Sequence, residues 1–107
     1  MKQQDSFGGL GRFAEPAVLV MVSLSGGAKH GYAIANDVEV VSGTRLGPGT
    51  LYGAIARLEE RGLIEALPSA DRRRPYRLTT PGVEALRGHV ATLARVADAG
   101  RRRLTDA

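Results

Sequence analysis

No cysteine occurs among the 107 residues, so the sequence excludes disulfide bonds, iron–sulfur clusters and zinc sites built on thiolates. The two histidines, His30 and His89, stand far apart and outside any cluster with metal-ligand spacing. We therefore expect no structural or catalytic metal. The sequence also has no glycine-rich phosphate loop before a helix and no histidine–carboxylate arrangement suggested by spacing. It therefore predicts neither an enzyme nor a cofactor.

Long apolar runs are missing as well. The most apolar segment, residues 17–22, is much shorter than the ~20 residues that a membrane-spanning helix needs. Residues 25–28 imitate a signal-peptide cleavage site, but Asp5 and Glu15 precede the apolar segment, and cleavage would remove a helix that the core needs. We interpret the segment as a core helix and expect a cytoplasmic protein with no membrane partner.

Positive charge is present in excess and is unevenly distributed. The formal net charge is +4, and between residues 72 and 103 nine arginines accompany only two acidic residues, Glu84 and Asp98. A basic balance concentrated in a few elements favours a polyanionic partner such as nucleic acid.

The first half of the chain predicts two helices in a single small domain. Residues 1–11 are expected to form a loose arm. A first helix opens at Glu15 and Pro16 and ends near Ser25, and it is apolar nearly all round, which is typical of a buried helix. A second helix begins at residues 30–32 and ends near Ser42. Its predicted buried stripe contains Tyr32, Ile34, Ala35, Val38 and Val41.

The next segment predicts a helix followed at once by two paired strands. Thr50 is the expected N-cap of the helix, and Gly62 is its expected left-handed stop. Residues 63–67 and 76–79 are expected to pair, and the loop between them carries three adjacent arginines. A helix fits the major groove of a duplex, and an arginine-rich ribbon can hold phosphate or reach the minor groove. We therefore predict a mainly α fold with a small β-hairpin, namely a winged helix–turn–helix over residues 12–79.

A fourth helix is predicted from Thr80, with Thr80 as its cap and Pro81 in its first turn. Its apolar residues recur at alternating steps of three and four, which is the heptad pattern of a helix that packs along another helix. Up to Leu104 the helix would extend ~37 Å at 1.5 Å per residue, so it would overhang a small domain. We predict that residues 80–107 hold a homodimer, and we assign no DNA contact to the basic tail at residues 101–103. The predicted seam contains Val83, Leu86, Val90, Leu93, Ala97, Gly100 and Leu104.

Several short motifs in this sequence resemble those of the PadR family of bacterial transcriptional regulators, in particular its short members with a single C-terminal helix. The similarity runs from about residue 14 to 95, and the order and spacing of the motifs make it specific. The matching residues are His30-Gly31-Tyr32; Leu46 with Pro48-Gly49-Thr50-Leu51-Tyr52; Leu58-Glu59 with Gly62-Leu63-Ile64; Arg73-Arg74 with Tyr76-Arg77-Leu78-Thr79; and Gly82.

The resemblance implies a homodimer with an N-terminal winged helix–turn–helix and a C-terminal helix that holds the dimer. It also implies repression of a nearby gene that is relieved by a small molecule, which is a phenolic acid or a hydrophobic drug in known cases. Three positions depart from the family pattern. Ala33 stands where an acid is frequent, Gly53 stands where proline is frequent, and Pro75 replaces an aromatic residue, which predicts a wing paired over fewer residues.

The candidate DNA contacts lie on the third helix, on the wing and at the start of the second helix. Thr50 can present the helix N-terminus to a phosphate, and Arg57 can pair bidentately with guanine, the alternative being an intrahelical pair with Glu60. For Tyr52 the resemblance favours an exposed position facing DNA over a core position, whereas for His30 a structural hydrogen bond is the favoured alternative. The full set is Lys29, His30, Gly49, Thr50, Tyr52, Arg57, Arg72, Arg73 and Arg74.

A small hydrophobic or aromatic effector would fit best between the two copies, beside the first and fourth helices. Small residues at Ala91, Ala94 and Ala97 leave room there, although the sequence has no tryptophan to stack on a planar ligand. Two other classes compete with a DNA-binding regulator. One is a winged-helix module that binds protein without specific DNA binding, which the arginine-rich loop disfavours. The other is a metal-sensing winged-helix protein, which the absence of thiols disfavours.

Overall fold

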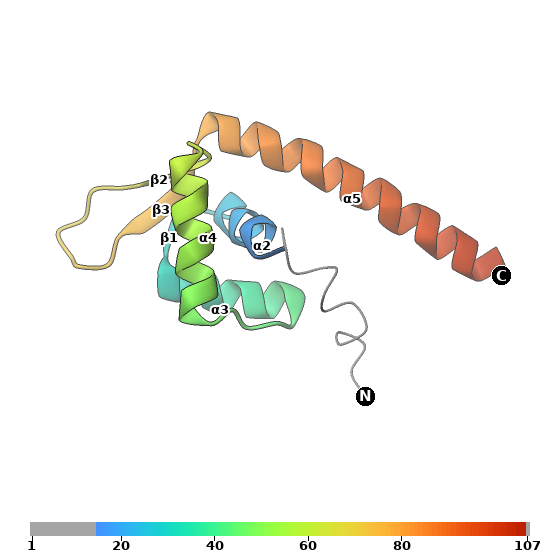
Figure 1. Ribbon diagram of the computed structural model, residues 1–107, viewed down its shortest axis with the longest axis horizontal. Helices are drawn as coiled ribbons and strands as arrows, with labels where there is room; N and C mark the ends of the chain where they lie inside the picture. Colours follow the sequence, from blue (N-terminus) through green and yellow to red (C-terminus); the bar gives the residue numbers. More distant parts are fainter. Residues whose placement is uncertain (1–14, 107) are drawn as a thin grey trace.

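A computed structural model of the protein describes residues 15–106. The predicted arm at residues 1–11 lies outside this range. Figure 1 shows a helical head, a strand pair whose connecting loop projects to one side, and a long final helix that leaves the head on the other side. The elements are α2 (Glu15–Ser25), β1 (Lys29–His30), α3 (Gly31–Ser42), α4 (Pro48–Glu60), β2 (Ile64–Ala66), β3 (Pro75–Leu78) and α5 (Thr80–Asp106).

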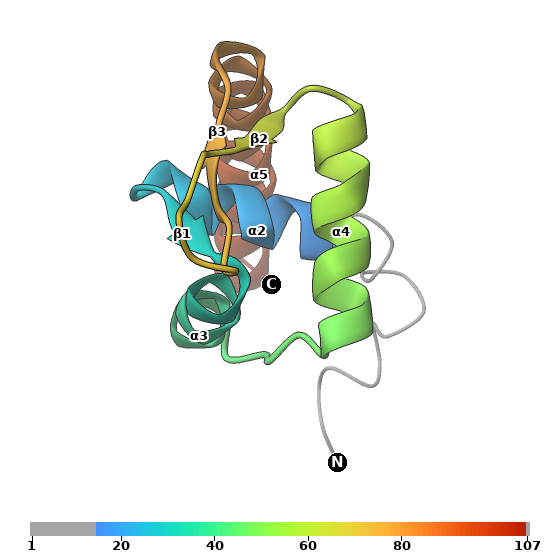
Figure 2. The ribbon, with the colours of Figure 1, turned by 90° about the vertical axis from the view of Figure 1, so that its left-hand side faces the viewer.

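Helix α2 lies at the centre of the head, where it contacts α3, α4, β3 and α5 (Figure 2). Val20, Met21 and Leu24 are buried in it, as expected for a helix with apolar residues on several sides. Its central position explains why residues 17–22 are so apolar. The core contains Val20, Met21, Leu24, Ile34, Ala35, Val38, Leu46, Leu51, Ala54, Ile55, Leu58, Ile64 and Leu86.

Helix α3 buries a narrower stripe than predicted. Ile34, Ala35 and Val38 are buried, but Tyr32 and Val41 are exposed, so the prediction was wrong for these two residues. At 100° per residue Tyr32 falls well outside the arc of the buried residues, and the Arg45 guanidinium lies 5.9 Å from the centre of its ring. Val41 occupies the last turn, beyond the part of the helix that packs on the core.

Helix α4 begins three residues earlier than predicted. Gly47 is its N-cap residue, Pro48 is in its first turn, and the Leu51 amide donates to the Gly47 carbonyl at 2.9 Å. Thr50 therefore lies inside the first turn, and its predicted role as the N-cap was wrong. The end of the helix agrees with the prediction, because Gly62 has a φ of 74° and the Leu63 amide returns to the Leu58 carbonyl at 3.0 Å.

The predicted strand pair forms, and a third strand joins it. The antiparallel order is β1-β3-β2, with Glu65 opposite Arg77 and Lys29 opposite Tyr76. Arg77 Nε donates to Glu65 Oε2 at 2.7 Å, so the pair is also linked through its side chains. Strand β1 has only two residues, which is too short for an alternating pattern to reveal. Pro75 is the first residue of β3, a position that tolerates proline.

Helix α5 is capped one residue earlier than predicted. The Gly82 amide donates to Thr79 Oγ1 at 3.1 Å, so Thr79 rather than Thr80 satisfies the first turn. Thr79 Oγ1 also donates to the Gly62 carbonyl at 2.7 Å, which ties the start of α5 to the end of α4. None of the helices in residues 15–106 is long and apolar enough to cross a membrane.

The predicted seam of α5 divides into two parts. Leu86 is buried in the core of its own chain, whereas Leu93 is 48% exposed and Leu104 is 79% exposed. Beyond the first two turns the helix runs away from the head (Figure 1). The exposed large apolar residues on α5 are Val83, Val90, Leu93, Val96 and Leu104.

Candidate nucleic-acid interface

A cavity of about 380 Å³ opens between α4, the start of α3 and the wing, which is the loop at residues 67–74 with its strands β2 and β3. We call it the arginine–tyrosine cavity, because it is lined by three arginines and by all three tyrosines of the chain. No described carboxylate lines it. The lining residues are His30, Gly31, Tyr32, Tyr52, Arg72, Arg73, Arg74 and Tyr76.

The wing arginines Arg72, Arg73 and Arg74 are exposed and form no ion pair with any residue in the described part of the chain. Three other arginines are paired: Arg77 lies 2.7 Å from Glu65, Arg45 lies 3.0 Å from Glu39, and Arg101 pairs with Asp98. Three adjacent cations repel one another and gain nothing from the fold. The Asp71 carboxylate, which accepts from the Arg73 backbone amide at 3.4 Å, offsets part of their charge. The wing therefore keeps an excess of uncompensated positive charge.

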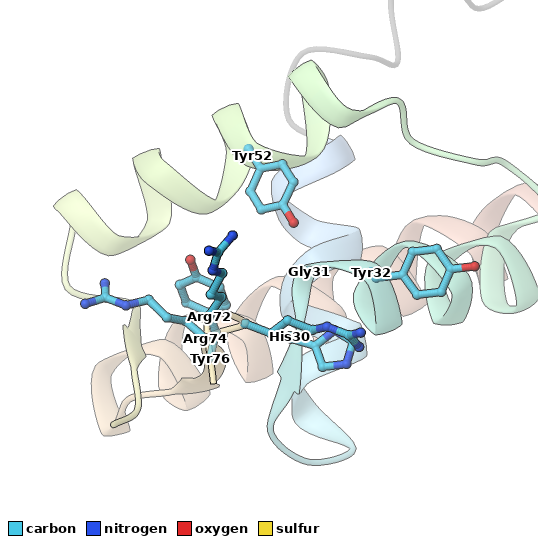
Figure 3. A pocket seen from close by; sticks show the side chains of 8 residues that line it. His30, Gly31, Tyr32, Tyr52, Arg72, Arg74 and Tyr76 are labelled. Carbon is cyan, nitrogen blue, oxygen red and sulfur yellow. The ribbon is translucent and has the colours of Figure 1, made fainter. Parts of the chain in front are cut away.

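Tyr52 projects from the first half of α4 toward the start of α3, where Gly31 lies (Figure 3). A Cβ atom on residue 31 would collide with the Tyr52 hydroxyl and would lie 2.7 Å from its Cζ. The hydroxyl thus occupies the space that any other residue at position 31 would fill. With 51% of its surface exposed, Tyr52 also borders the solvent, as the family resemblance predicted.

Tyr76 forms another part of the wall, from strand β3 (Figure 3). Burial raises the pKa of its hydroxyl above 10.0, and the nearby Glu59 carboxylate and Tyr52 act in the same direction, while Arg74 opposes them. The shift moves the pKa further from neutral pH, where a phenol is already protonated, so the hydroxyl keeps its capacity to donate a hydrogen bond.

Lys29 and His30 behave differently from each other. The Lys29 ammonium donates to the Ser23 carbonyl and lies 3.9 Å from Asp37, so it fixes the turn between α2 and α3. His30 lines the cavity at the N-cap position of α3 and caps no backbone amide. The structural hydrogen bond favoured for His30 does not occur with any residue between 15 and 106, so its imidazole is available to a ligand.

The predicted contacts on α4 lie on its exposed surface. Gly49 and Thr50 are exposed in the first turn, and Arg57 is exposed two turns later. Arg57 forms no ion pair within residues 15–106, so the alternative of a pair with Glu60 is not observed. These three residues do not line the arginine–tyrosine cavity, which gathers His30, Tyr52 and the wing arginines from three separate elements.

Sequence reasoning missed three residues of the cavity: Gly31, Tyr32 and Tyr76. Gly31 and Tyr32 adjoin the predicted contact His30, and Tyr76 stands two residues after the arginine run, where an inward-facing position on the returning strand could have been inferred. The missing signal was strand β1, which pairs His30 with Pro75 and thereby places the start of α3 beside the wing.

A second hollow, of about 530 Å³, lies between the end of α2, strand β3 and the first turns of α5. We call it the α2–α5 groove. Leu24, Ala28 and Leu78 give it an apolar floor, and Val83, Leu86 and Val90 form the side contributed by α5. Arg87 lies at its edge and forms no ion pair with described residues. Within residues 15–106, no group of three or more histidines, aspartates or glutamates could hold a metal ion.

Residues 18–88 match the transcriptional regulator PadR-like family. The chain belongs to the PadR family. A PadR family transcription regulator from Clostridium difficile R20291 has the same fold, with a TM-score of 0.75 and 26% identity over 83% of this chain and 97% of that one. A transcriptional regulator from Clostridium thermocellum, 22% identical, shares the fold with a TM-score of 0.74 over 95% of this chain and 97% of the other.

A curated relative is similar in sequence over most of the PadR-like chain. It is an uncharacterized 37.1 kDa protein in transposon TN4556 of Streptomyces fradiae, and it is 46% identical over 85 residues. Those residues are 79% of this chain but 25% of the relative, so the chain spans about a quarter of the length of the curated relative it matches.

Proposed function

We propose that this PadR-like protein is a dimeric, sequence-specific DNA-binding repressor whose activity is relieved by a small molecule. The observation that carries the proposal is the uncompensated charge of Arg72, Arg73 and Arg74 beside the exposed N-terminal half of α4. A bound polyanion would neutralise the charge of these arginines. Membership of a family of transcriptional regulators makes duplex DNA the polyanion.

In the proposed complex α4 enters the major groove and the wing follows the adjacent backbone. Arg57 reads a guanine, because its exposed guanidinium has no competing partner among the described residues. Gly49 and Thr50 present the start of α4 to a phosphate, and Tyr52 and His30 contact the backbone next to them. Lys29 acts mainly by fixing the turn that positions His30.

The dimer is proposed to form along α5. Val90, Leu93, Ala97 and Leu104 repeat on one side of a helix that has left its own core, and exposed apolar residues at heptad spacing are buried when a second helix packs on them. Val83 lies at the same surface, while Leu86 is already used in the core. Residues 12–79 then form the DNA-binding head and residues 80–107 the dimerisation segment.

The effector is proposed to be a small hydrophobic or aromatic molecule, and the α2–α5 groove supports this assignment. The groove joins an apolar floor to the free guanidinium of Arg87, which suits a ligand with an apolar body and an anionic group. Because α5 forms one side of the groove, a ligand there would alter how α5 meets the head.

A gel shift with the region upstream of the protein's own gene cluster, repeated at several salt concentrations, tests the proposal. Specific binding that weakens steeply with salt is expected, because counterions are released from the duplex. A protein that binds no duplex, but captures a protein partner, would instead be an interaction module. Arg95→Ala, on the exposed middle of α5, is a charge-matched control for changes in the wing.

A further inference from the structure

The arginine–tyrosine cavity has the chemistry of an anion site. Its lining residues include three arginines, His30, Tyr52 and Tyr76, and no described carboxylate is among them. The Glu59 carboxylate lies near Tyr76 but does not line the cavity. Arginine pairs bidentately with the oxygens of a phosphate, and a protonated phenol adds a neutral donor. The Tyr76 hydroxyl is protonated at neutral pH, as any tyrosine with a pKa of 10.0 or above is.

The Tyr52 wall of this cavity depends on residue 31 having no side chain. Tyr52 reaches from α4 to the start of α3 because residue 31 is glycine, since a Cβ atom there would collide with the Tyr52 hydroxyl. Gly31 has no left-handed backbone angle, so its conformation alone does not require glycine. The requirement comes from the neighbouring ring.

We infer that the arginine–tyrosine cavity seats one phosphate group and that Gly31 is a positioning residue, which allows Tyr52 to form the wall of this seat. The seat holds a phosphodiester of the duplex backbone if the proposed function is correct. The same groups would hold a free phosphate or phosphomonoester without DNA. At about 380 Å³ the cavity also has room for the sugar or the water that accompanies a phosphate.

The inference predicts a specific coupling between positions 31 and 52. In Gly31→Ala the methyl group displaces the half-exposed Tyr52 ring, which can turn outward without disturbing the core. Once Tyr52 is replaced by alanine, the new methyl group meets no ring. Gly31→Ala should therefore weaken binding in the native background and have no effect in the Tyr52→Ala background.

A double-mutant cycle on duplex affinity measures this coupling. We expect Gly31→Ala and Tyr52→Ala each to weaken binding about two- to tenfold, the value of one hydrogen bond, and the double variant to match Tyr52→Ala alone. Gly88→Ala, where a Cβ meets open space on α5, should bind as the native protein does. Effects of the two changes that multiply would overturn the inference, because Gly31 would then act independently of Tyr52.

Two further arms identify the source of the phosphate. Inorganic phosphate, titrated against chloride at equal ionic strength, should give saturable shifts of the Arg72, Arg73 and Arg74 side-chain signals in NMR spectra. These shifts should be weaker in Gly31→Ala than in Gly88→Ala. In duplexes with a neutral methylphosphonate at successive positions, one position per half-site should abolish the difference between native protein and Gly31→Ala.

The outcomes separate this inference from the proposed function. If the protein binds phosphate saturably but binds no duplex, the phosphate site in the cavity is supported for a free phosphate ligand, and the DNA-binding proposal is refuted. Duplex binding with no coupling between positions 31 and 52, and with phosphate shifts that do not saturate, would retain the DNA-binding proposal and remove the seat.

Discussion

Gly82 places its Cα directly against the backbone of Leu63, so that a Cβ atom on residue 82 would collide with the Leu63 carbonyl oxygen and lie 2.9 Å from its carbon. The contact joins the first turn of α5 to Leu63, three residues beyond the end of α4. It is backbone against backbone, and neither side can rotate away. The Thr79 amide also donates to the Leu63 carbonyl at 3.1 Å, so the same peptide is held from two sides.

Gly82→Ala is therefore expected to lower the free energy of unfolding by about 3 kcal/mol, the upper part of the range for overpacking a tight contact. Urea denaturation followed by circular dichroism measures it. Gly88→Ala, six residues later on the same helix, meets open space and should raise stability by about 0.5–1 kcal/mol. Equal stabilities of the two variants would contradict the contact.

Leu93→Asp is expected to give a folded monomer. Leu93 is 48% exposed in the single chain, so a carboxylate there is tolerated by the head, but in the proposed dimer it would be buried without a partner. Sedimentation velocity measures the change in mass. Thr92→Asp, one residue away on a side of α5 that faces away from the seam, should remain dimeric, and a dimeric Leu93→Asp would refute the seam.

Arg57 and the wing arginines should affect DNA binding in different ways. Arg57→Ala is expected to cost about 1–3 kcal/mol at the operator and to relax the base preference at one position per half-site. Replacing Arg72, Arg73 and Arg74 together by alanine should weaken binding to all sequences and reduce the salt slope by about 0.9 for each phosphate that is no longer neutralised. Selection from a randomised duplex, combined with salt titrations, tells these effects apart. Unchanged selectivity in Arg57→Ala would contradict its proposed role.

The raised pKa of Tyr76 predicts a loss of stability in alkali. Its folded pKa lies above the ordinary value of 10.0, so the folded state holds the proton more tightly than the unfolded chain does. This contribution is complete below pH 10 and is lost as the pH rises through the folded value. The stability difference between the native protein and Tyr76→Phe should thus move in favour of the phenylalanine variant between pH 7 and pH 11. A constant difference in urea denaturation would contradict the shift.

Most of the fold could be predicted from periodicity and turn residues. The central helix α2, the stop at Gly62 and the long α5 were identified because each has a strong local signal. The caps were not, since Thr50, three residues after Gly47, and Thr80, next to Thr79, are equally good candidates by residue type alone. Strand β1 has two residues, and only its pairing with β3 makes it a strand.

The candidate site was predicted in part. The charge of the wing and the exposed position of Tyr52 follow from residue type and resemblance. The contact between Gly31 and Tyr52 does not, because it joins residues from two helices whose approach is fixed by the core beneath them. Likewise, the burial of Leu86 in its own chain depends on how α5 leaves the head, which a heptad pattern cannot specify.

The hydrogen bonds of Thr79 fix the start of α5 to the end of α4, so that α5 can move only as a rigid rod about this point. Its 27 residues extend about 40 Å, so a swing of about 10° at Thr79 would carry the far end through about 7 Å. If the C-terminal parts of the two α5 helices are held together in the proposed dimer, the same rotation changes the distance between the two heads. A ligand bound in the α2–α5 groove, beside the first turns of α5, would therefore change the spacing of the two heads and lower their affinity for both half-sites without contacting either α4.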